Sequence, residues 1–328
     1  MASTDLSGKT CLVTGASGFI GSYLCNELVR QGAKVKALLH SESSGNWDSS
    51  FVCVLGKQQI PNHVMQDVSV IFHLAGRAHS LSDCVHQDQL YYETNVEGTR
   101  NLLEAARNTN VSKFIYFSSV KSMGEESDIR LDEHSEPKPL STYGKSKLEA
   151  EQLVLGGEYL LSSTVLRLTM VYGDSDKGNL PKMIKAISKN WFPPFPKIEN
   201  KRSMIHVEDV VQAAIKVAET EISAGEVYIL SDGTDYSTRQ IYENIRKTLG
   251  KKIPQWGIPL SALSAIANTG DVLKRITRRR VLFDSDNLQK LIGNSYYSSQ
   301  KIKTELGFSP KFTLFDAMPK IIANLKIK

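Results

Sequence analysis

Cysteine is scarce in this chain of 328 residues, and no two of its four cysteines form a CxxC pair. Cys11, Cys25, Cys53 and Cys84 all lie near the beginning of the chain, and none follows. This usage excludes a disulfide framework and a cysteine-rich zinc site, so we expect no metal. Cys11 and Cys25 stand among apolar residues, where inert core thiols are expected. A reducing, cytoplasmic location fits best.

Long apolar runs and a strong charge of one sign are also missing. The longest mostly apolar stretch, Ile258 to Ala267, is too short to span a bilayer. We expect a core helix there, with surface association as the alternative. Met1 to Lys9 is polar and does not resemble a secretory signal. We therefore expect no integral membrane segment.

The net charge of +5 is small for this length, and one dense basic run occurs, Arg278 to Arg280. Proteins that bind nucleic acid concentrate basic charge on one face, so we expect no nucleic-acid partner. The arginine run is typical of a solvated helix end, and a phosphate contact is the alternative.

The chain does contain an alternation of short β-branched runs and longer helical patterns. Strands are expected at Thr10–Thr14, Lys34–His40, Val68–Leu74, Lys113–Ser118 and Thr164–Val171. Helices are expected at Phe19–Gln31, Tyr92–Thr109 and Ser141–Leu155. This order predicts an α/β fold of the Rossmann type, a doubly wound parallel sheet covered on both faces. Ligands of such sheets bind at the carboxyl ends of the strands.

After Gly173 the regular alternation of strands and helices stops. Helices are expected at Leu180–Lys189, Val207–Ala218 and Ser237–Leu249, a strand at Glu226–Leu230, and a proline-rich turn at Trp191–Pro196. We infer a smaller, discontinuous C-terminal domain. The sheet domain would comprise residues 1–173 and about 206–230, and the second domain about 174–205 and 231–328.

A glycine-rich turn follows the first expected strand, with the sequence TGASGFIG from Thr14 to Gly21. Gly15 permits a tight turn, Gly18 lets a pyrophosphate approach the backbone, and Gly21 lets helix and strand pack closely. The free N–H groups and the helix dipole then bind phosphate. The turn predicts a dinucleotide site, and a tight turn without a ligand is the alternative.

The end of the second strand bears on the choice between NAD and NADP. An acidic residue there would bind the ribose hydroxyls of NAD, but this strand ends Leu38-Leu39-His40-Ser41. His40 can contact a 2′-phosphate, or it can be an ordinary exposed histidine. The cofactor is predicted to be NAD or NADP, and this feature favours NADP.

Tyr143 and Lys147 lie one helical turn apart on the same face of the third expected helix. A free tyrosine has a pKa of about 10, and a neighbouring ammonium lowers it. Tyr143 can then exchange a proton with an alcohol or ketone during hydride transfer. Ser119 ends a strand at the same edge of the sheet and can align the reacting oxygen. YxxxK alone also occurs on ordinary surface helices.

These residues stand within longer stretches that are typical of one family. The stretches are TGASGFIGSYL from Thr14, HLAG from His73, NVEGTRNLLEAA from Asn95, FIYFSS from Phe114, YGKSKLEAE from Tyr143, LRLTMVYG from Leu166, RSMIHVEDV from Arg202 and LGFSP from Leu306. They cover nearly the whole chain in order. The chain resembles the extended short-chain dehydrogenase/reductase superfamily, in its nucleotide-sugar epimerase/dehydratase branch.

The resemblance implies roles for particular residues. Ser119, Tyr143 and Lys147 would be catalytic. The residues that would bind the dinucleotide are Gly15, Ser17, Gly18, Phe19, Ile20, Gly21, His40, Leu74, Ala75, Gly76, Asn95, Tyr143 and Lys147. The diphosphate of a UDP-hexose would be held by Gly178, Asn179 and Arg202, since guanidinium binds phosphate bidentately. A homodimer is common in such proteins.

One departure narrows the reaction. Dehydratases of this family have Asp-Glu after the strand-end hydroxyl, but Val120 and Lys121 follow Ser119 here, so 4,6-dehydration is not expected. We predict a UDP-sugar 4-epimerase that transfers a hydride at C4, with Tyr143 as base, in surface-polysaccharide precursor synthesis. The alternatives are an NAD(P)H-dependent 4-ketoreductase of a UDP-4-keto-6-deoxy-hexosamine and a non-catalytic dinucleotide-binding protein.

Overall fold

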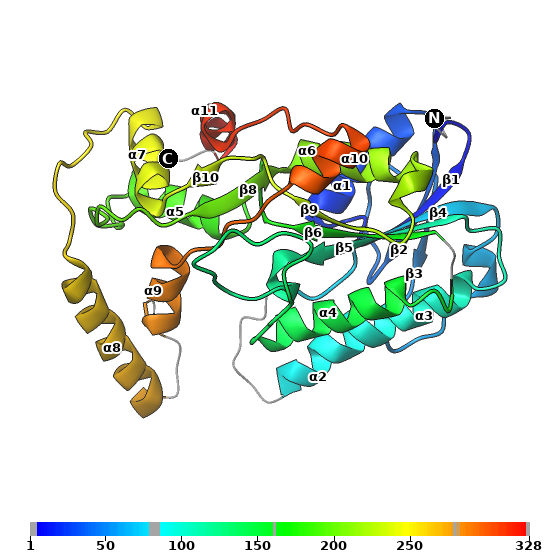
Figure 1. Ribbon diagram of the computed structural model, residues 1–328, viewed down its shortest axis with the longest axis horizontal. Coiled ribbons are helices and arrows are strands. Elements are labelled where there is room, and N and C mark those ends of the chain that lie inside the picture. Colours follow the sequence, from blue (N-terminus) through cyan, green and yellow to red (C-terminus); the bar gives the residue numbers. More distant parts are fainter. Residues whose placement is uncertain (1–4, 79–85, 160–161, 278–280, 282, 326–328) are drawn as a thin grey trace.

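The computed structural model describes residues 5–78, 86–159, 162–277, 281 and 283–325, and Figure 1 shows two sheets. The larger sheet is wholly parallel, and its spatial order is β3-β2-β1-β4-β5-β6-β9. Its strands are β1 (Thr10–Thr14), β2 (Lys34–Leu39), β3 (Ser49–Val52), β4 (Val68–His73), β5 (Lys113–Ser119), β6 (Ser163–Leu168) and β9 (Val227–Leu230). The smaller sheet comprises β7 (Met170–Tyr172), β8 (Arg202–His206) and β10 (Asp235–Tyr236).

Helices cover both faces of the larger sheet, which confirms the doubly wound fold. Cys11 and Val13 of β1 point to one face, and Leu12 points to the other. The first face is packed by α1 (Phe19–Arg30), α6 (Val207–Ala218) and α10 (Gln300–Leu306). The second is packed by α3 (Gly98–Ala106) and α4 (Thr142–Leu155). Burial on both faces explains why the strands are continuously apolar rather than alternating.

The strand order reverses between β1 and β4, so the connections that follow these two strands run in opposite directions along the sheet, and ligands of such sheets bind at this point. The predicted core thiols lie away from solvent. Burial raises the pKa of Cys11 and of Cys25 to about 12, so both stay protonated and unreactive. Cys84 lies outside the described residues.

Helices from the second half of the chain pack around the smaller sheet in a separate apolar cluster. They are α5 (Asn179–Ser188), α7 (Thr238–Thr248), α8 (Leu260–Thr277), α9 (Ser285–Ile292) and α11 (Leu314–Asn324). The cap predicted at Ser237 is confirmed, since its hydroxyl accepts a hydrogen bond from the Gln240 backbone N–H at 3.0 Å. Residues 191–196 form neither helix nor strand, as predicted.

Two predicted elements are each divided in the structure. The expected helix Tyr92–Thr109 consists of the end of α2 (His86–Tyr92), a π-helical turn (Glu93–Glu97) and α3. The expected strand Thr164–Val171 breaks at Thr169, so that β6 lies in the larger sheet and β7 in the smaller. Thr169 donates its backbone N–H and its hydroxyl to the Leu230 carbonyl, which ends the regular ladder there.

The helix expected at Ile258–Ala267 is present, but it is longer than expected and only partly buried. Helix α8 begins at Leu260, ends at Thr277, and buries Leu263, Ala267 and Gly270. Its remaining side chains are exposed or half-buried. Arg278 to Arg280 lie outside the described residues. Of the helices that the structure describes, none has both the length and the apolar character needed to cross a membrane.

Candidate active site

The glycine turn between β1 and α1 is shaped by close backbone contacts. Gly15 has φ +68°, and a Cβ there would lie 2.8 Å from the Ala75 N. A Cβ on Gly21 would come within 2.2 Å of the Gly15 carbonyl oxygen. No side chain caps the start of α1 at Gly18, which leaves the first N–H groups of the helix to another acceptor. This cradle of backbone donors fits a pyrophosphate.

We expect Gly21→Ala to weaken dinucleotide binding at least about tenfold, because a new methyl group cannot fit beside the Gly15 carbonyl and must displace the turn. Fluorescence titration with NAD measures this. Gly157→Ala is the control, because it adds the same methyl group at a glycine (φ +69°) with nothing within 4 Å of the new Cβ. Equal NAD affinity in both variants would contradict the role of the turn.

A chain of hydrogen bonds links the glycine turn to the segment after β4. The Ala75 N–H donates to the Thr14 hydroxyl at 3.0 Å, and that hydroxyl lies 2.7 Å from His73 Nδ1. His73 Nε2 lies 2.9 Å from the Thr99 hydroxyl, which itself donates to the Asn95 carbonyl. This pattern assigns the ring proton to Nε2, with Nδ1 as an acceptor. The neutral His73 ring therefore fixes β1, β4 and α3 relative to each other.

The burial of His73 has a consequence for acid stability. Burial lowers its pKa to about 3, with the nearby Lys147 as a smaller cause. An unfolded histidine has a pKa of about 6.5, so between pH 6.5 and 3 the unfolded chain binds the extra proton. We expect His73 to make the free energy of unfolding fall by about 1.4 kcal/mol per pH unit as the pH drops through this window.

Urea unfolding of wild type and His73→Asn between pH 3 and 8 measures this contribution. The variant should be less stable at pH 8, and its stability should fall less steeply below pH 6.5. His134→Asn, at an exposed position, is the control. Parallel pH curves for wild type and His73→Asn would refute the assignment of a neutral buried ring.

Asn95 joins three parts of the site from the π-helical turn, a feature often found at functional sites. Its side-chain NH₂ donates to the Ser146 hydroxyl at 2.9 Å and to the Arg77 carbonyl at 3.2 Å. Its Oδ1 accepts from the Arg77 N–H at 2.8 Å. A Cβ on Gly76 would lie 3.1 Å from this oxygen and 3.8 Å from Lys147 Nζ. The structure thus brings Gly76, Asn95 and Lys147 together.

Tyr143 stands in the first turn of α4, two residues after the capping residue Ser141. The Ser141 hydroxyl accepts from the Gly144 N–H at 3.1 Å. The Glu125 carboxylate accepts from the backbone N–H groups of Leu140 and Ser141, at 2.9 and 3.0 Å. These bonds fix the start of the helix and hence the direction of the Tyr143 ring.

The phenol of Tyr143 meets Ser119 from the end of β5. Burial raises the pKa of Tyr143, and a hydrogen bond with the Ser119 side chain acts against that rise. The net shift is upward, opposite to the lowering expected from the sequence, because burial outweighs the favourable contacts. The ring centre lies 5.8 Å from that of Tyr91.

Lys147 is buried, and its Nζ donates to the Phe117 carbonyl at 2.7 Å. The same nitrogen lies 4.1 Å from the centre of the Tyr116 ring. Burial lowers the Lys147 pKa to about 7, and the Glu151 carboxylate partly offsets this. The amine is therefore held at the carboxyl edge of the sheet, beside Gly76, and loses its charge near neutral pH.

A buried ion pair beneath the serine-rich end of β5 was not predicted. Arg167 of β6 lies 2.7 Å from the Glu151 carboxylate of α4, and both side chains are almost fully buried. Glu151 also accepts hydrogen bonds from the hydroxyls of Ser118 and Ser122. The signal in the sequence is an arginine inside an otherwise apolar strand, because such a charge needs a buried partner.

Arg202 begins β8 and is half-buried. It donates to the Gly293 carbonyl at 3.1 Å, and burial lowers its pKa. Lys121, two residues after Ser119, is also half-buried. Its pKa is lowered first by burial, and the positive charge of Arg202 adds to the lowering. Carboxylates act against both shifts, Glu125 on Lys121 and Glu126 on Arg202, so this pair of cations lies among negative charges of the protein.

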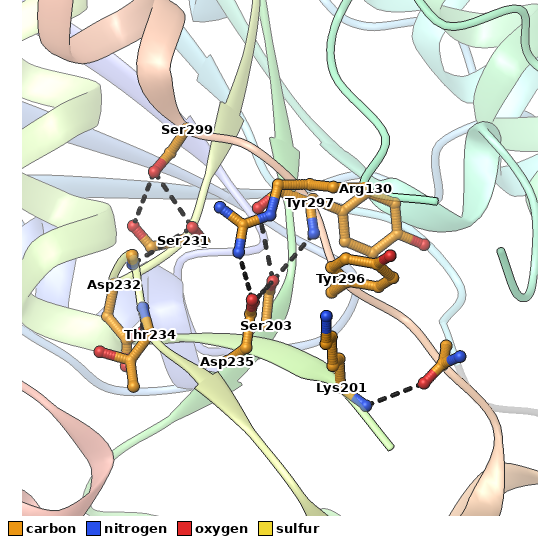
Figure 2. A network of polar contacts seen from close by, with 12 residues as sticks. Arg130, Lys201, Ser203, Ser231, Asp232, Thr234, Asp235, Tyr296, Tyr297 and Ser299 are labelled. Atoms are coloured by element: carbon orange, nitrogen blue, oxygen red, sulfur yellow. Dashed lines mark hydrogen bonds and ion pairs between the residues drawn. The ribbon is translucent and has the colours of Figure 1, made fainter. Parts of the chain in front are cut away.

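Figure 2 shows how the neighbours of Arg202 are held. The Tyr297 N–H donates to the Ser203 hydroxyl at 2.9 Å, and this hydroxyl donates to Asp235 at 3.3 Å. An ion pair joins Asp235 to Arg130. Lys201 Nζ lies 5.1 Å from the centre of the Tyr296 ring. The strand that carries Arg202 is therefore fixed to segments far away in the sequence.

The remaining predicted site residues are the pair Gly178 and Asn179 and several members of the predicted dinucleotide site. Gly178 has φ +103° and precedes α5, which Asn179 begins without a side-chain cap. None of the described contacts joins this pair to Tyr143. His40 follows the end of β2 and is exposed, as is Ser17 in the glycine turn. Phe19, Ile20, Leu74 and Ala75, which also belong to the predicted dinucleotide site, are half-buried.

Comparison with known proteins identifies one family model that matches residues 11–231, described as the NAD dependent epimerase/dehydratase family. A UDP-glucose 4-epimerase of Vibrio cholerae is 28% identical, over 93% of this chain and 92% of its own length. An N-acetyl-alpha-D-glucosaminyl-diphospho-ditrans,octacis-undecaprenol 4-epimerase of Escherichia coli O157:H7 is also 28% identical, over 95% and 93% of the two chains. A third similar protein is the 4-hydroxy-2-methyl-3-oxo-4-farnesyl-3,4-dihydroquinoline-1-oxide ketoreductase of Stigmatella aurantiaca, 28% identical over 92% of both chains.

The fold is shared with solved structures. The UDP-glucose 4-epimerase of Thermotoga maritima, solved with UDP-glucose, superimposes with a TM-score of 0.75 at 24% identity. The match covers 97% of this chain and 98% of that one. This likeness supports the arrangement of the two sheets and their helices.

Proposed function

Because this chain belongs to the NAD dependent epimerase/dehydratase family, we propose that it is a UDP-sugar 4-epimerase that acts by hydride transfer at C4 of the hexose. Family membership makes it an NAD-dependent epimerase or oxidoreductase. The observation that carries the finer proposal is the buried Lys147, one helical turn from Tyr143, whose Nζ is held at the Phe117 carbonyl beside Gly76. The similar epimerases that act on a UDP-sugar and on a lipid-linked sugar support a C4 reaction in precursor synthesis for surface polysaccharides.

The glycine turn fits the pyrophosphate of NAD, since a Cβ on Gly15 or Gly21 would fill the space that the backbone needs. NAD, when bound, supplies a hydride acceptor and donor. Lys147 and Asn95 lie where the nicotinamide half would be expected, beside Gly76. In this proposal residues 1–173 and about 206–230 hold NAD. Residues of about 174–205 and 231–328 hold the nucleotide sugar.

Three side chains would handle the sugar oxygen. Tyr143, as phenolate, takes the proton of the C4 hydroxyl while the hydride leaves C4, and it returns a proton when the 4-ketone is reduced on its other face. Ser119 orients the oxygen by a hydrogen bond. Lys147, when charged, favours the phenolate and reaches the ribose. Because burial raises the Tyr143 pKa, the phenolate depends on such nearby positive charge.

Arg202, with Gly178 and Asn179, is proposed to bind the diphosphate. The electrostatic interaction between Lys121 and Arg202 supports a site for an anionic group near these two cations. These contacts identify neither the base nor the sugar of the substrate. A UDP-hexose is therefore proposed from the family resemblance and the similar epimerases.

A 4-ketoreductase of a UDP-4-keto-6-deoxy-hexosamine is the second candidate. It would use the same side chains once and would consume NAD(P)H. The observation that favours it is the exposed His40 after β2, where an NAD-specific acid would otherwise be expected. A similar protein with a ketoreductase name is consistent with this reading.

One experiment separates these candidates. The purified protein is incubated with UDP-glucose, UDP-N-acetylglucosamine or a UDP-4-keto-sugar, with and without NAD(P)H, and products are followed by NMR and nicotinamide absorbance. Formation of the C4 epimer without cofactor consumption is the result that we expect. Loss of one NAD(P)H per keto-sugar would instead show the reductase. Tight dinucleotide binding with no turnover of any sugar would leave a non-catalytic protein.

A further inference from the structure

Helix α4 lies on one face of the larger sheet (Figure 1) and contacts the end of β5 at three points. A Cβ on Gly144 would lie 2.4 Å from the Lys121 carbonyl oxygen, so the two backbones approach closely there. About one turn later, Lys147 donates to the Phe117 carbonyl at 2.7 Å. After a further turn, the Glu151 carboxylate accepts hydrogen bonds from this segment. Since residues three and four apart share one side of a helix, a single face of α4 holds the end of β5.

The Glu151 carboxylate divides its two oxygens between different partners. Arg167 donates to Oε2 from Nη2 at 2.7 Å and from Nε at 3.1 Å, which balances the charge. Oε1 accepts from the Ser118 hydroxyl and, at 2.7 Å, from the Ser122 hydroxyl, and the Arg167 Nε is farther away, at 3.3 Å. A guanidinium can bind both oxygens of a carboxylate by itself. The serine hydroxyls are therefore not needed to pair the charge.

Ser118 and Ser122 enclose the segment that carries Ser119. Ser118 precedes it in β5, and Ser122 ends the 3₁₀ turn that follows the strand. The Ser119 hydroxyl accepts from the Lys121 N–H at 3.2 Å and so caps this turn. With Oε1 bonded to both ends of the segment, the carboxylate restricts the turn and hence the place of Ser119.

Glu151 also acts on Lys147, four residues earlier on the same face of α4. His73 of β4 and Tyr116 of β5 face the Lys147 amine as well. Burial keeps His73 neutral and raises the pKa of Tyr116 well above its usual value. The Glu151 carboxylate raises the pKa of Lys147 against the lowering caused by burial, and so favours the charged amine. One carboxylate thus influences two side chains that the proposed reaction needs.

We propose that Glu151 is a positioning residue of the active site, which acts through Ser118 and Ser122. It holds the turn that carries Ser119 at a fixed place relative to Tyr143. Glu151 itself touches neither sugar nor NAD in this proposal, because its oxygens are bonded within the protein. The inference rests on the proposed function, since that function assigns the reaction to these side chains.

The double variant Ser118→Ala/Ser122→Ala tests this role, because it keeps the ion pair and removes only the hydroxyls. We expect kcat per molecule of bound NAD to fall at least tenfold, with KM and the affinity for NAD within threefold of wild type, because misplaced groups slow the chemical step more than binding. Dividing by bound NAD removes the contribution of unfolded protein. Hydride transfer should then limit turnover, which a full primary isotope effect on kcat reports with UDP-glucose or UDP-N-acetylglucosamine deuterated at C4.

A second variant removes the carboxylate without leaving a buried charge. Glu151→Met/Arg167→Met replaces the ion pair by apolar side chains of similar length, a change that often keeps a protein about as stable as before. Its kcat per bound NAD should fall at least tenfold, as in the serine variant, and its isotope effect should also be full. This variant separates the positioning role from the stability of the buried pair.

Lys113→Met is the matched control, since Lys113 is buried at the other end of β5 and its Nζ donates to the Thr220 carbonyl at 2.6 Å. It should lower the thermal midpoint but leave kcat per bound NAD and the isotope effect as in wild type. The inference is overturned if the serine variant keeps its kcat within threefold of wild type, or if Lys113→Met loses as much.

The wild type reports separately on the proposed function. If it acts as a ketoreductase, the same variants are compared with a UDP-4-keto-sugar and NAD(P)H deuterated at C4 of the nicotinamide, and the same outcomes decide. If it converts none of these sugars with either nicotinamide cofactor, the proposed function is wrong, and the inference is overturned with it. A fully active wild type with a fully active serine variant overturns the inference alone.

Discussion

Tyr143→Phe is expected to lower kcat by about 10³-fold while leaving the affinity for NAD within about threefold of wild type. The substitution removes the proton-transferring hydroxyl and its hydrogen bond with Ser119. The ring that packs against Tyr91, with centres 5.8 Å apart, is kept. Steady-state kinetics on the epimer-forming substrate and NAD titration measure the two quantities.

Tyr91→Phe provides the matched control, since it also deletes one tyrosine hydroxyl at this aromatic pair but not the one beside Ser119. Its kcat should remain within about fivefold of wild type if proton transfer belongs to Tyr143. Near-normal turnover by Tyr143→Phe would remove the phenol from the mechanism. Equal losses in both variants would point to ring packing instead.

The second large effect concerns the stability of the sheet beneath the site. Glu151→Gln leaves the Arg167 guanidinium buried without its counter-charge, and the two serine hydroxyls lose a charged acceptor. We expect the free energy of unfolding to fall by about 3–5 kcal/mol, as is usual when one member of a buried pair is removed. Urea denaturation followed by circular dichroism gives this value.

A double-mutant cycle tests whether the pair itself is the cause. Arg167→Met alone should be as damaging as Glu151→Gln, because each leaves one buried partner uncompensated. Combining the two substitutions should be less destabilising than the sum of the single effects. Strict additivity would show that the two side chains do not depend on each other.

Local patterns predicted the larger sheet and the dinucleotide turn well. The strands are buried on both faces, so each appears as a short apolar run, and Gly15 and Gly21 mark a turn in which a Cβ would clash with the backbone. Tyr143 and Lys147 could be placed together because they are four residues apart on one helix. These features depend on neighbours in the sequence.

What could not be predicted depends on contacts between distant segments. The His73 hydrogen bonds join residues 59 and 26 positions away, and Arg167 needed Glu151 from another element. The exposure of α8 was missed because an apolar helix looks the same whether protein or another surface covers it. The upward pKa shift of Tyr143 follows from burial, which its spacing from Lys147 does not reveal.

The path of the chain between the two sheets bears on how the protein is made. The chain leaves the larger sheet after β6, returns for β9, leaves again for β10, and returns once more at α10 before it ends in α11. The backbone N–H of Leu314, at the start of α11, donates to the Tyr236 hydroxyl, and the backbone N–H of Phe312 donates to the Asp209 carboxylate. A nascent chain on the ribosome therefore cannot complete either half early. Nearly the whole polypeptide must emerge before the two halves can pack completely. A prematurely terminated chain should therefore be degraded by proteases and should not form a shorter active enzyme.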